Sequence, residues 1–189
     1  MKGLVFGRLE GKRTLMVGDV GSGKTRAMAS LLRSAVASRP PAEVTVFDFA
    51  PDETVLCGKI VGGKVSGGTA MAAGLNYLSP RLEPPRLSGR DAEEVLSIAR
   101  RNASLTAGCI EEYLSRPTPV LFANDLTMHL HAGDLRVLVS AVERSKTFIG
   151  NAYAGESLKE DRGSGISTRE RDLLGELKRW MDDVIVLGE

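Results

Sequence analysis

Five stretches of mostly apolar residues recur along the chain, each of the length of a strand. They read TLMVGD, EVTVFDF, PVLFAND, TFIGNAY and DDVIVLG, starting at residues 14, 43, 119, 147 and 182. Their apolar runs are continuous rather than alternating with polar residues, which is typical of strands buried on both faces. The pattern therefore predicts a sheet with both faces covered.

Between these stretches, apolar residues repeat at the spacing of helices that turn one face to a core. The three sets are Met28, Leu31, Leu32, Ala35, Val36; Leu135, Leu138, Val139, Val142; and Leu173, Leu174, Leu177, Trp180, Met181. Alternating strands and helices predict an α/β domain with a mostly parallel central sheet flanked by helices.

Capping residues support these helices. Asp134 stands just ahead of the second set, and Ser167 with Glu170 forms a capping box for the third. Asp91 and Glu94 form another box, which predicts a further helix to about residue 114.

The chain has 189 residues, which suits a single domain over 1–189. The region of about 51–90 fits the pattern least. It contains VGGKVSGG and SPRLEPPRLSGR, which we interpret as a glycine-punctuated insertion followed by an exposed connection, not as a domain boundary.

Charge and cysteine content narrow the function classes. The 25 basic and 24 acidic residues give a formal charge of +1, which does not indicate a nucleic acid or membrane partner. Cys57 and Cys109 lie outside metal-ligand spacing, as expected in a reducing compartment. No apolar run approaches about 20 residues, and charges interrupt the start of the chain, so we expect a cytoplasmic protein.

The most specific motif lies between the first strand and the first helix. Gly18, Gly23, Lys24 and Thr25 satisfy G-x-x-x-x-G-K-[ST], the Walker A pattern. Such glycines let backbone N–H groups face a phosphate, Lys24 would reach the β- and γ-phosphates, and the Thr25 hydroxyl would bind Mg²⁺. The predicted nucleotide-binding residues are Gly18, Asp19, Val20, Gly21, Ser22, Gly23, Lys24, Thr25 and Arg26. A glycine-rich turn used for tight packing alone is the alternative.

A second motif fits the first. The strand VLFAND ends in Asp125, at the sheet edge where phosphates bind in parallel α/β folds. There the carboxylate would be the Walker B ligand of Mg²⁺. Alternatively, Asp125 caps a turn.

With GDVGSGKT and VLFAND, the chain resembles the P-loop NTPase superfamily, most closely the RecA/KaiC-like ATPases of its additional-strand division. The resemblance implies a three-layer P-loop NTPase fold, ATP and Mg²⁺ as cofactors, and assembly into a homo-oligomeric ring or filament.

In that group, the strand after the P-loop helix ends in an acid that orients the attacking water. The corresponding stretch here is VTVFDFAPDE, so Asp48, Asp52 and Glu53 are the candidates. The next strand of the family ends in a γ-phosphate sensor, which places Asn151 in that role or leaves it a turn residue. The loop after Asn151 contains Arg162, Arg169 and Arg171, which are candidate phosphate contacts or members of a solvated loop.

His129 and His131 form an H-x-H pair that would share one side of an extended segment. Without a third ligand in sight, surface or nucleotide-adjacent histidines are a better interpretation than a metal site.

The sequence leaves three functions open. The first is an ATPase that uses Lys24, Asn151 and one of the three acids. The second is a small P-loop kinase with a lid that carries arginines. The third is a nucleotide-binding switch with little turnover.

Overall fold

The computed structural model describes residues 4–56, 59–65 and 73–188 and contains a parallel sheet of six strands. In space the strand order is β5-β2-β6-β7-β1-β8, and all neighbouring pairs run parallel. The bounds are β1 (Arg13–Gly18), β2 (Val44–Asp48), β5 (Asn76–Leu78), β6 (Val120–Asn124), β7 (Thr147–Tyr153) and β8 (Asp183–Val186).

The five predicted strands are confirmed as β1, β2, β6, β7 and β8. In the four central strands among them, β1, β2, β6 and β7, nearly every residue is buried. The prediction of burial on both faces is wrong for the edge strand β8, whose residues alternate between half-buried and exposed because successive side chains point to opposite faces and one face is left uncovered.

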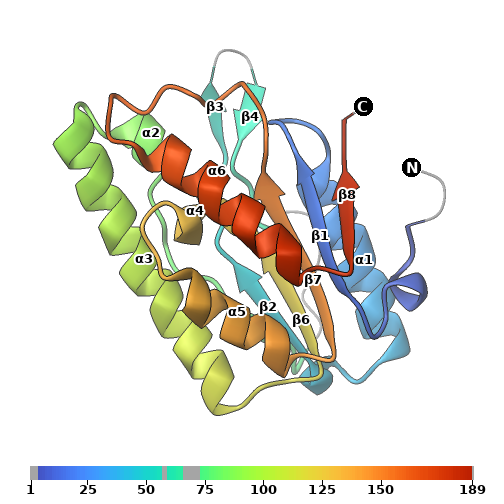
Figure 1. The fold of residues 1–189 in the computed structure, drawn as a ribbon. Coiled ribbons are helices and arrows are strands. Elements are labelled where there is room, and N and C mark those ends of the chain that lie inside the picture. The colour runs from blue at the N-terminus through green and yellow to red at the C-terminus, as the bar shows by residue number, and fades with distance from the viewer. Residues whose placement is uncertain (1–3, 57–58, 66–72, 189) are drawn as a thin grey trace.

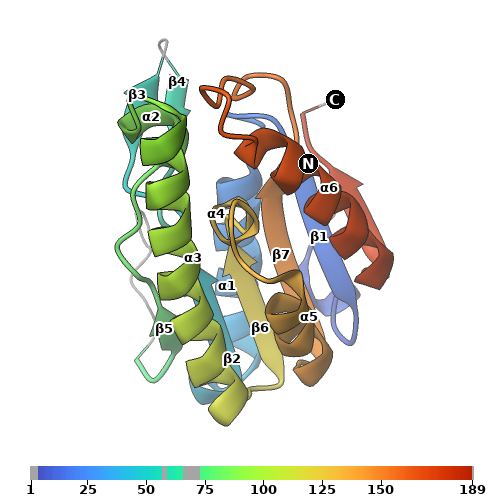
Figure 2. The same cartoon turned by 60° about the vertical axis from the view of Figure 1, so that its left-hand side comes forward.

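Helices cover both faces and make three layers (Figures 1 and 2). The main helices are α1 (Lys24–Ser38), α3 (Ala92–Ser115), α5 (Leu135–Arg144) and α6 (Ile166–Leu177), with short helices α2 (Pro85–Ser88) and α4 (Thr127–Leu130). α1 packs on one face, where Met28 and Leu31 meet Met16 and Phe122. α3, α5 and α6 pack on the other face, whose core includes Leu15.

Single turns of 3-10 helix complete the chain: η1 (Phe6–Arg8), η2 (Pro41–Glu43) and η4 (Lys178–Trp180). The third predicted helical stripe therefore ends earlier than expected. α6 stops at Leu177, and Trp180 lies in η4 with 40% of its surface exposed.

Two of the three predicted helix starts are confirmed. The Asp134 carboxylate accepts a hydrogen bond from Arg136 N at the start of α5, and Asp91 accepts one from Glu94 N at the start of α3. The Ser167 and Glu170 box is wrong, because α6 begins after Gly165, which adopts a left-handed conformation without a side-chain cap.

The region 51–90 adds a strand to the central sheet and contacts α3. It forms a hairpin of β3 (Thr54–Leu56) and β4 (Lys59–Val61), then the edge strand β5 and the short helix α2. The prediction that residues 79–90 form an exposed connection is wrong, since Leu82 and Pro85 are buried there. This segment packs along α3 (Figure 2).

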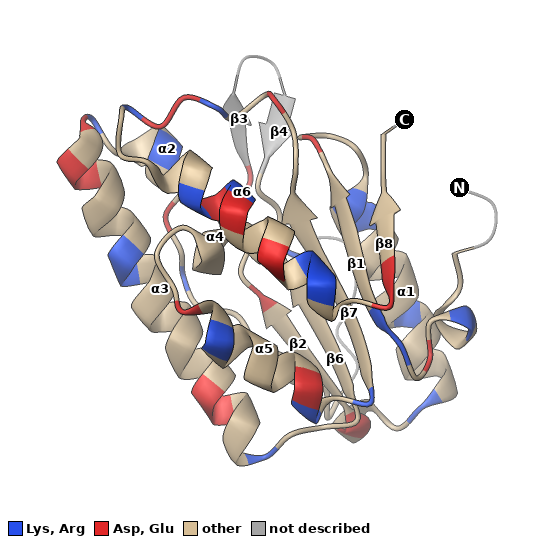
Figure 3. Ribbon diagram, viewed as in Figure 1, with Lys and Arg blue, Asp and Glu red and all other residues tan. Residues whose placement is uncertain are grey.

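Charged side chains of both signs are interspersed along the described ribbon, for example along α6 (Figure 3). Cys109 is a free, half-buried thiol whose pKa burial raises, and Cys57 lies outside the described residues. None of the described helices combines the length and the apolar character that crossing a membrane requires.

Candidate functional site

The loop between β1 and α1 makes a tight turn that depends on its glycines. Gly21 and Gly23 have φ values of 75° and 89°, which favour glycine. A Cβ on Gly18 would lie 2.4 Å from Leu187 O, so this position also requires glycine. Gly23 caps α1 without a side-chain hydrogen bond, and the first turn carries no acid. The exposed N–H groups and the helix dipole can therefore receive an anion.

The Lys24 side chain is hydrogen-bonded to the residues of this loop. Its Nζ donates hydrogen bonds to the carbonyl oxygens of Gly18 (2.8 Å) and Asp19 (2.7 Å) and to Ser22 Oγ (3.3 Å). Burial lowers the lysine pKa, and the nearby carboxylates of Asp125 and Asp19 oppose that shift. A phosphate entering the loop would replace these carbonyl partners with charged oxygens, which bind an ammonium more strongly.

Asp125 lies in an unusual turn directly after β6. Its φ is 57°, in the left-handed region that non-glycine residues rarely adopt. Its N–H donates to Asn151 Oδ1 at 2.9 Å, which ties the turn to β7. Burial raises the carboxyl pKa to about 6, with Glu170 adding to the shift and Lys24 opposing it. A cation at this carboxylate would relieve that cost.

One cavity of about 340 Å³ joins these groups at the carboxyl edge of the sheet. Lys24, Thr25, Asp125 and Asn151 all line it, as do Val20, Gly21, Gly23 and Arg26 of the loop. The cavity continues between the segment that contains α2 and the segment that contains α4. Its walls there include Pro84, Arg86, Leu87, Met128, His131 and Leu158.

The three acids proposed to orient water lie elsewhere. Asp48 is completely buried at the end of β2, where Val65 N, Tyr77 OH and Asn124 Nδ2 donate to its carboxylate. Asp52 and Glu53 are exposed. Asp125 is the sole acid among the described residues that line the cavity.

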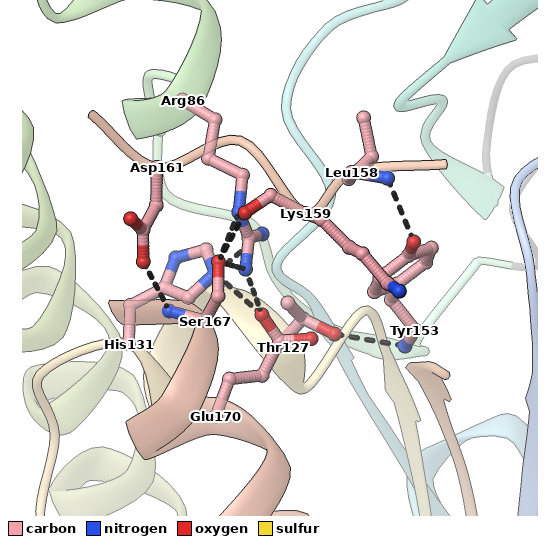
Figure 4. A network of polar contacts seen from close by, with 9 residues as sticks. All are labelled: Arg86, Thr127, His131, Tyr153, Leu158, Lys159, Asp161, Ser167 and Glu170. Carbon is pink, nitrogen blue, oxygen red and sulfur yellow. Dashed lines mark hydrogen bonds and ion pairs between the residues drawn. The ribbon is translucent and has the colours of Figure 1, made fainter. Parts of the chain in front are cut away.

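A buried polar cluster that includes the wall residues Arg86 and His131 was not predicted from the sequence (Figure 4). Arg86 of α2 forms an ion pair with Glu170 of α6, and these side chains are 8% and 5% exposed. His131 Nε2 lies 3.0 Å from Arg86 Nη1 and 3.1 Å from Glu170 Oε2, and Ser167 Oγ accepts from Arg86 Nη2 at 3.1 Å. One sequence signal could have predicted that Glu170 is buried. It precedes Leu174 by four residues and therefore lies on the same buried face of α6.

The loop between β7 and α6 is hydrogen-bonded to the loop between β1 and α1, residues 19–23. The Asp19 carboxylate accepts hydrogen bonds from the N–H groups of Glu156 (3.1 Å) and Ser157 (3.3 Å). A Cβ on Gly155 would lie 2.3 Å from Asp19 Cγ, so the backbone at Gly155 lies directly against the Asp19 side chain. Farther along, the Tyr153 hydroxyl accepts from Leu158 N at 2.8 Å.

The arginines predicted as phosphate contacts do not line the cavity. Arg162 and Arg171 are exposed, and Arg169 Nη2 donates to Gly133 O at 2.8 Å. The buried guanidinium at the cavity is instead that of Arg86.

The interpretation of His129 and His131 as surface residues is wrong, since they are 0% and 2% exposed. They lie on and just after α4, not on an extended segment. Both ring nitrogens of His129 have partners, Thr106 Oγ1 (2.8 Å) and Asp134 O (3.1 Å), while His131 reaches the cavity. The described residues contain no group of three or more His, Cys, Asp or Glu side chains that could hold a metal by themselves.

No protein-family model matches the sequence, and comparison with curated proteins finds no match. Among solved structures, a Pif1 helicase from Candida albicans is similar over 95% of this chain and 36% of its own, with 16% identity and a TM-score of 0.40. An ATPase from the type III secretion system of pathogenic bacteria is similar over 95% of this chain and 52% of its own, with 14% identity and a TM-score of 0.44. The chain thus spans about a third and about half of these proteins.

Proposed function

We propose that this chain binds a nucleoside triphosphate, expected to be ATP, together with Mg²⁺ and hydrolyses its γ-phosphate. The observation that carries the proposal is the meeting of Lys24, Thr25, Asp125 and Asn151 in one cavity at the start of α1. Asp125 and Asn151 come from two segments outside the Walker A match, so their approach to Lys24 and Thr25 is an observation that the match does not contain.

Each side chain has a role that its surroundings support. The loop N–H groups and the start of α1 bind phosphate oxygens, and Lys24 neutralises the β- and γ-phosphates. The Thr25 hydroxyl and Asp125 carboxylate are the oxygen ligands that would hold Mg²⁺, which in such sites keeps waters and phosphates as its other ligands. When bound, the ion supplies positive charge against the charge that develops on the phosphates. Asn151 would contact the γ-phosphate, as the family resemblance implies.

The sheet order supports the resemblance to the additional-strand division of P-loop NTPases, since β7 lies between β1 and β6. A RecA/KaiC-like assignment, a cytoplasmic location, and assembly into a homo-oligomeric ring or filament stay predictions. The interspersed charges give no support for a nucleic acid partner (Figure 3).

The orientation of the attacking water by Asp48, Asp52 or Glu53 also stays a prediction. Asp48 already accepts three hydrogen bonds, and none of the three acids lines the cavity. Hydrolysis by one of them would need a rearrangement around the bound nucleotide.

A second function is favoured by the shape of the cavity. Beyond Asp125 it continues along Pro84, Leu87, Met128 and Leu158, a mostly apolar wall that a single water does not require. This space suits the acceptor of a small P-loop kinase. The lack of a second acid at the cavity, among the described residues, fits either this kinase or a switch with slow turnover.

The test is phosphate release from ATP with Mg²⁺, measured together with ATP affinity. Lys24→Ala and Asp125→Asn should abolish release. If Asp52 or Glu53 orients the water, its alanine variant should abolish release without loss of binding, and Asp48→Ala should abolish release if Asp48 does. Binding without release by the wild-type protein would reject the hydrolase and direct the search to acceptors. Absence of ATP binding would reject the proposal as a whole.

A further inference from the structure

Asp48 is enclosed by hydrogen-bond donors from two directions. Val65 N (2.7 Å) and the Tyr77 hydroxyl, both from the 51–90 region, donate to its Oδ2. On the other side, Asn124 Nδ2 donates to its Oδ1 at 2.7 Å. The carboxylate is 0% exposed, so water cannot supply or replace these partners.

From Asp48 a chain of hydrogen bonds runs through the side-chain amides of Asn124 and Asn151. It crosses the neighbouring strands β2, β6 and β7 near their carboxyl ends. Asn124, the last residue of β6, accepts a hydrogen bond through Oδ1 from Asn151 Nδ2 of β7 at 2.7 Å. Asn151 in turn accepts through Oδ1 from the backbone N–H of Asp125 at 2.9 Å. Asn124 and Asn151 are 1% and 2% exposed.

The direction of this chain follows from the carboxylate at its start. An ionised carboxylate only accepts hydrogen bonds, so Asn124 has to turn its NH₂ toward Asp48. The Asn124 carbonyl then faces Asn151, which presents its own NH₂ and leaves its carbonyl for Asp125 N–H. Reversal of either amide would bring two donors or two acceptors together in a buried site.

We propose that Asp48 is a positioning residue, which holds the Asp125 turn in shape through Asn124 and Asn151. The turn needs such support, because Asp125 has a φ of 57° and its N–H has no strand partner after the end of β6. The claim that this shape serves Mg²⁺ rests on the proposed function. The claim that Asp48 controls the turn does not.

The same contacts connect the 51–90 region to the site. Val65 and Tyr77 hold the Asp48 carboxylate from that region, and Lys64 Nζ donates to the Asp48 carbonyl at 3.2 Å. The insertion is thus connected to the Asp125 turn through the carboxylate of Asp48.

The decisive substitution is Asp48→Asn, which keeps size and changes polarity. Its NH₂ would oppose either Val65 N–H or the Asn124 NH₂, so one buried donor loses its acceptor. Asn124→Leu removes the middle link of this chain of hydrogen bonds and leaves the other partners of Asp48 in place. Asp172→Asn is the matched control, since it changes the same charge at an exposed position of α6.

The measurement is amide hydrogen exchange by NMR on the nucleotide-free protein. We expect the Asp125 N–H to exchange about tenfold faster in Asp48→Asn and Asn124→Leu, with the amides of β1 and β8 unchanged. Unchanged exchange at Asp125 in both variants would overturn the proposal. Equal acceleration throughout the sheet would do so too, because it would reveal only general destabilisation.

ATP titrations with Mg²⁺ and with EDTA give the functional readout. Asp48→Asn should weaken binding about tenfold with Mg²⁺ and leave binding in EDTA unchanged. An equal loss in both media would contradict a role through Asp125. If the wild-type protein binds no ATP, the proposed function fails, while the exchange experiment still decides whether Asp48 controls the turn.

Discussion

The Asp125 carboxyl, which is proposed to bind Mg²⁺, offers a sharp test, because a buried charge held ready for a cation should destabilise the nucleotide-free protein. Burial raises its pKa from 3.8 to about 6, so the folded chain pays for ionising it at neutral pH. Replacement by asparagine keeps the size and removes the charge. We expect Asp125→Asn to be more stable than the wild type in the absence of nucleotide.

The sign follows from proton linkage. A raised pKa means that the folded state holds the Asp125 proton more tightly than the unfolded state does. Wild-type stability therefore declines as the pH rises from about 4 to about 6 and is constant above that range, as far as this group is concerned. The advantage of Asp125→Asn should be full at pH 7.5, about half at pH 5 and nearly absent at pH 4.

The magnitude comes from the size of the shift. About two pH units correspond to about 3 kcal/mol if the whole shift acts on stability. Because Asp125 is only partly shielded from solvent, we expect about half of this, or roughly 1.5 kcal/mol. For a chain of this length, that raises Tm by about 3–6 °C.

The assay is thermal unfolding without nucleotide or metal at pH 7.5, 5 and 4, with Asp172→Asn as the control for loss of an exposed charge. A lower Tm for Asp125→Asn at pH 7.5 would refute the reasoning. A gain that does not change with pH would also refute it, because the effect would then not come from ionisation of Asp125.

Two further predictions concern contacts around the cavity. Glu170→Gln should lower the free energy of unfolding by about 3 kcal/mol in urea titrations, because it leaves the buried charge of Arg86 without its partner. A loss below about 1 kcal/mol would show that the pair is not buried in solution. Gly155→Ala should lift the following loop from Asp19 and speed proteolysis within residues 154–165, whereas Gly175→Ala, which has open space around it, should not. Equal cleavage of the two variants would contradict the docking of this loop.

Much of the fold could be predicted because local pattern and burial agree in the sheet. The continuous apolar runs of β1, β2, β6 and β7 mark strands covered on both faces, and the Walker A residues mark the loop between β1 and α1. Asp134 and Asp91 were correctly identified as helix caps, since a cap bonds to backbone only two or three residues away.

The failures share a physical cause, namely partners that are distant in sequence. Ser167 and Glu170 have the spacing of a capping box, but an arginine about 80 residues earlier takes both side chains. The catalytic role of Asp48 stays a prediction, and local sequence did not show that Tyr77, Val65 and Asn124 donate hydrogen bonds to its carboxylate.

The sequence by itself determined the strands, the main helices and the glycine-rich loop between β1 and α1, because these depend on backbone preferences and on the spacing of nearby residues. Only the tertiary structure decided which side chains share the cavity. Asp125 and Asn151 meet Lys24 there because parallel strands bring their carboxyl ends to one edge. The partner of each buried charge comes from a distant segment, as with Arg86 and Glu170. The spacing of nearby residues in the sequence therefore does not predict these pairs.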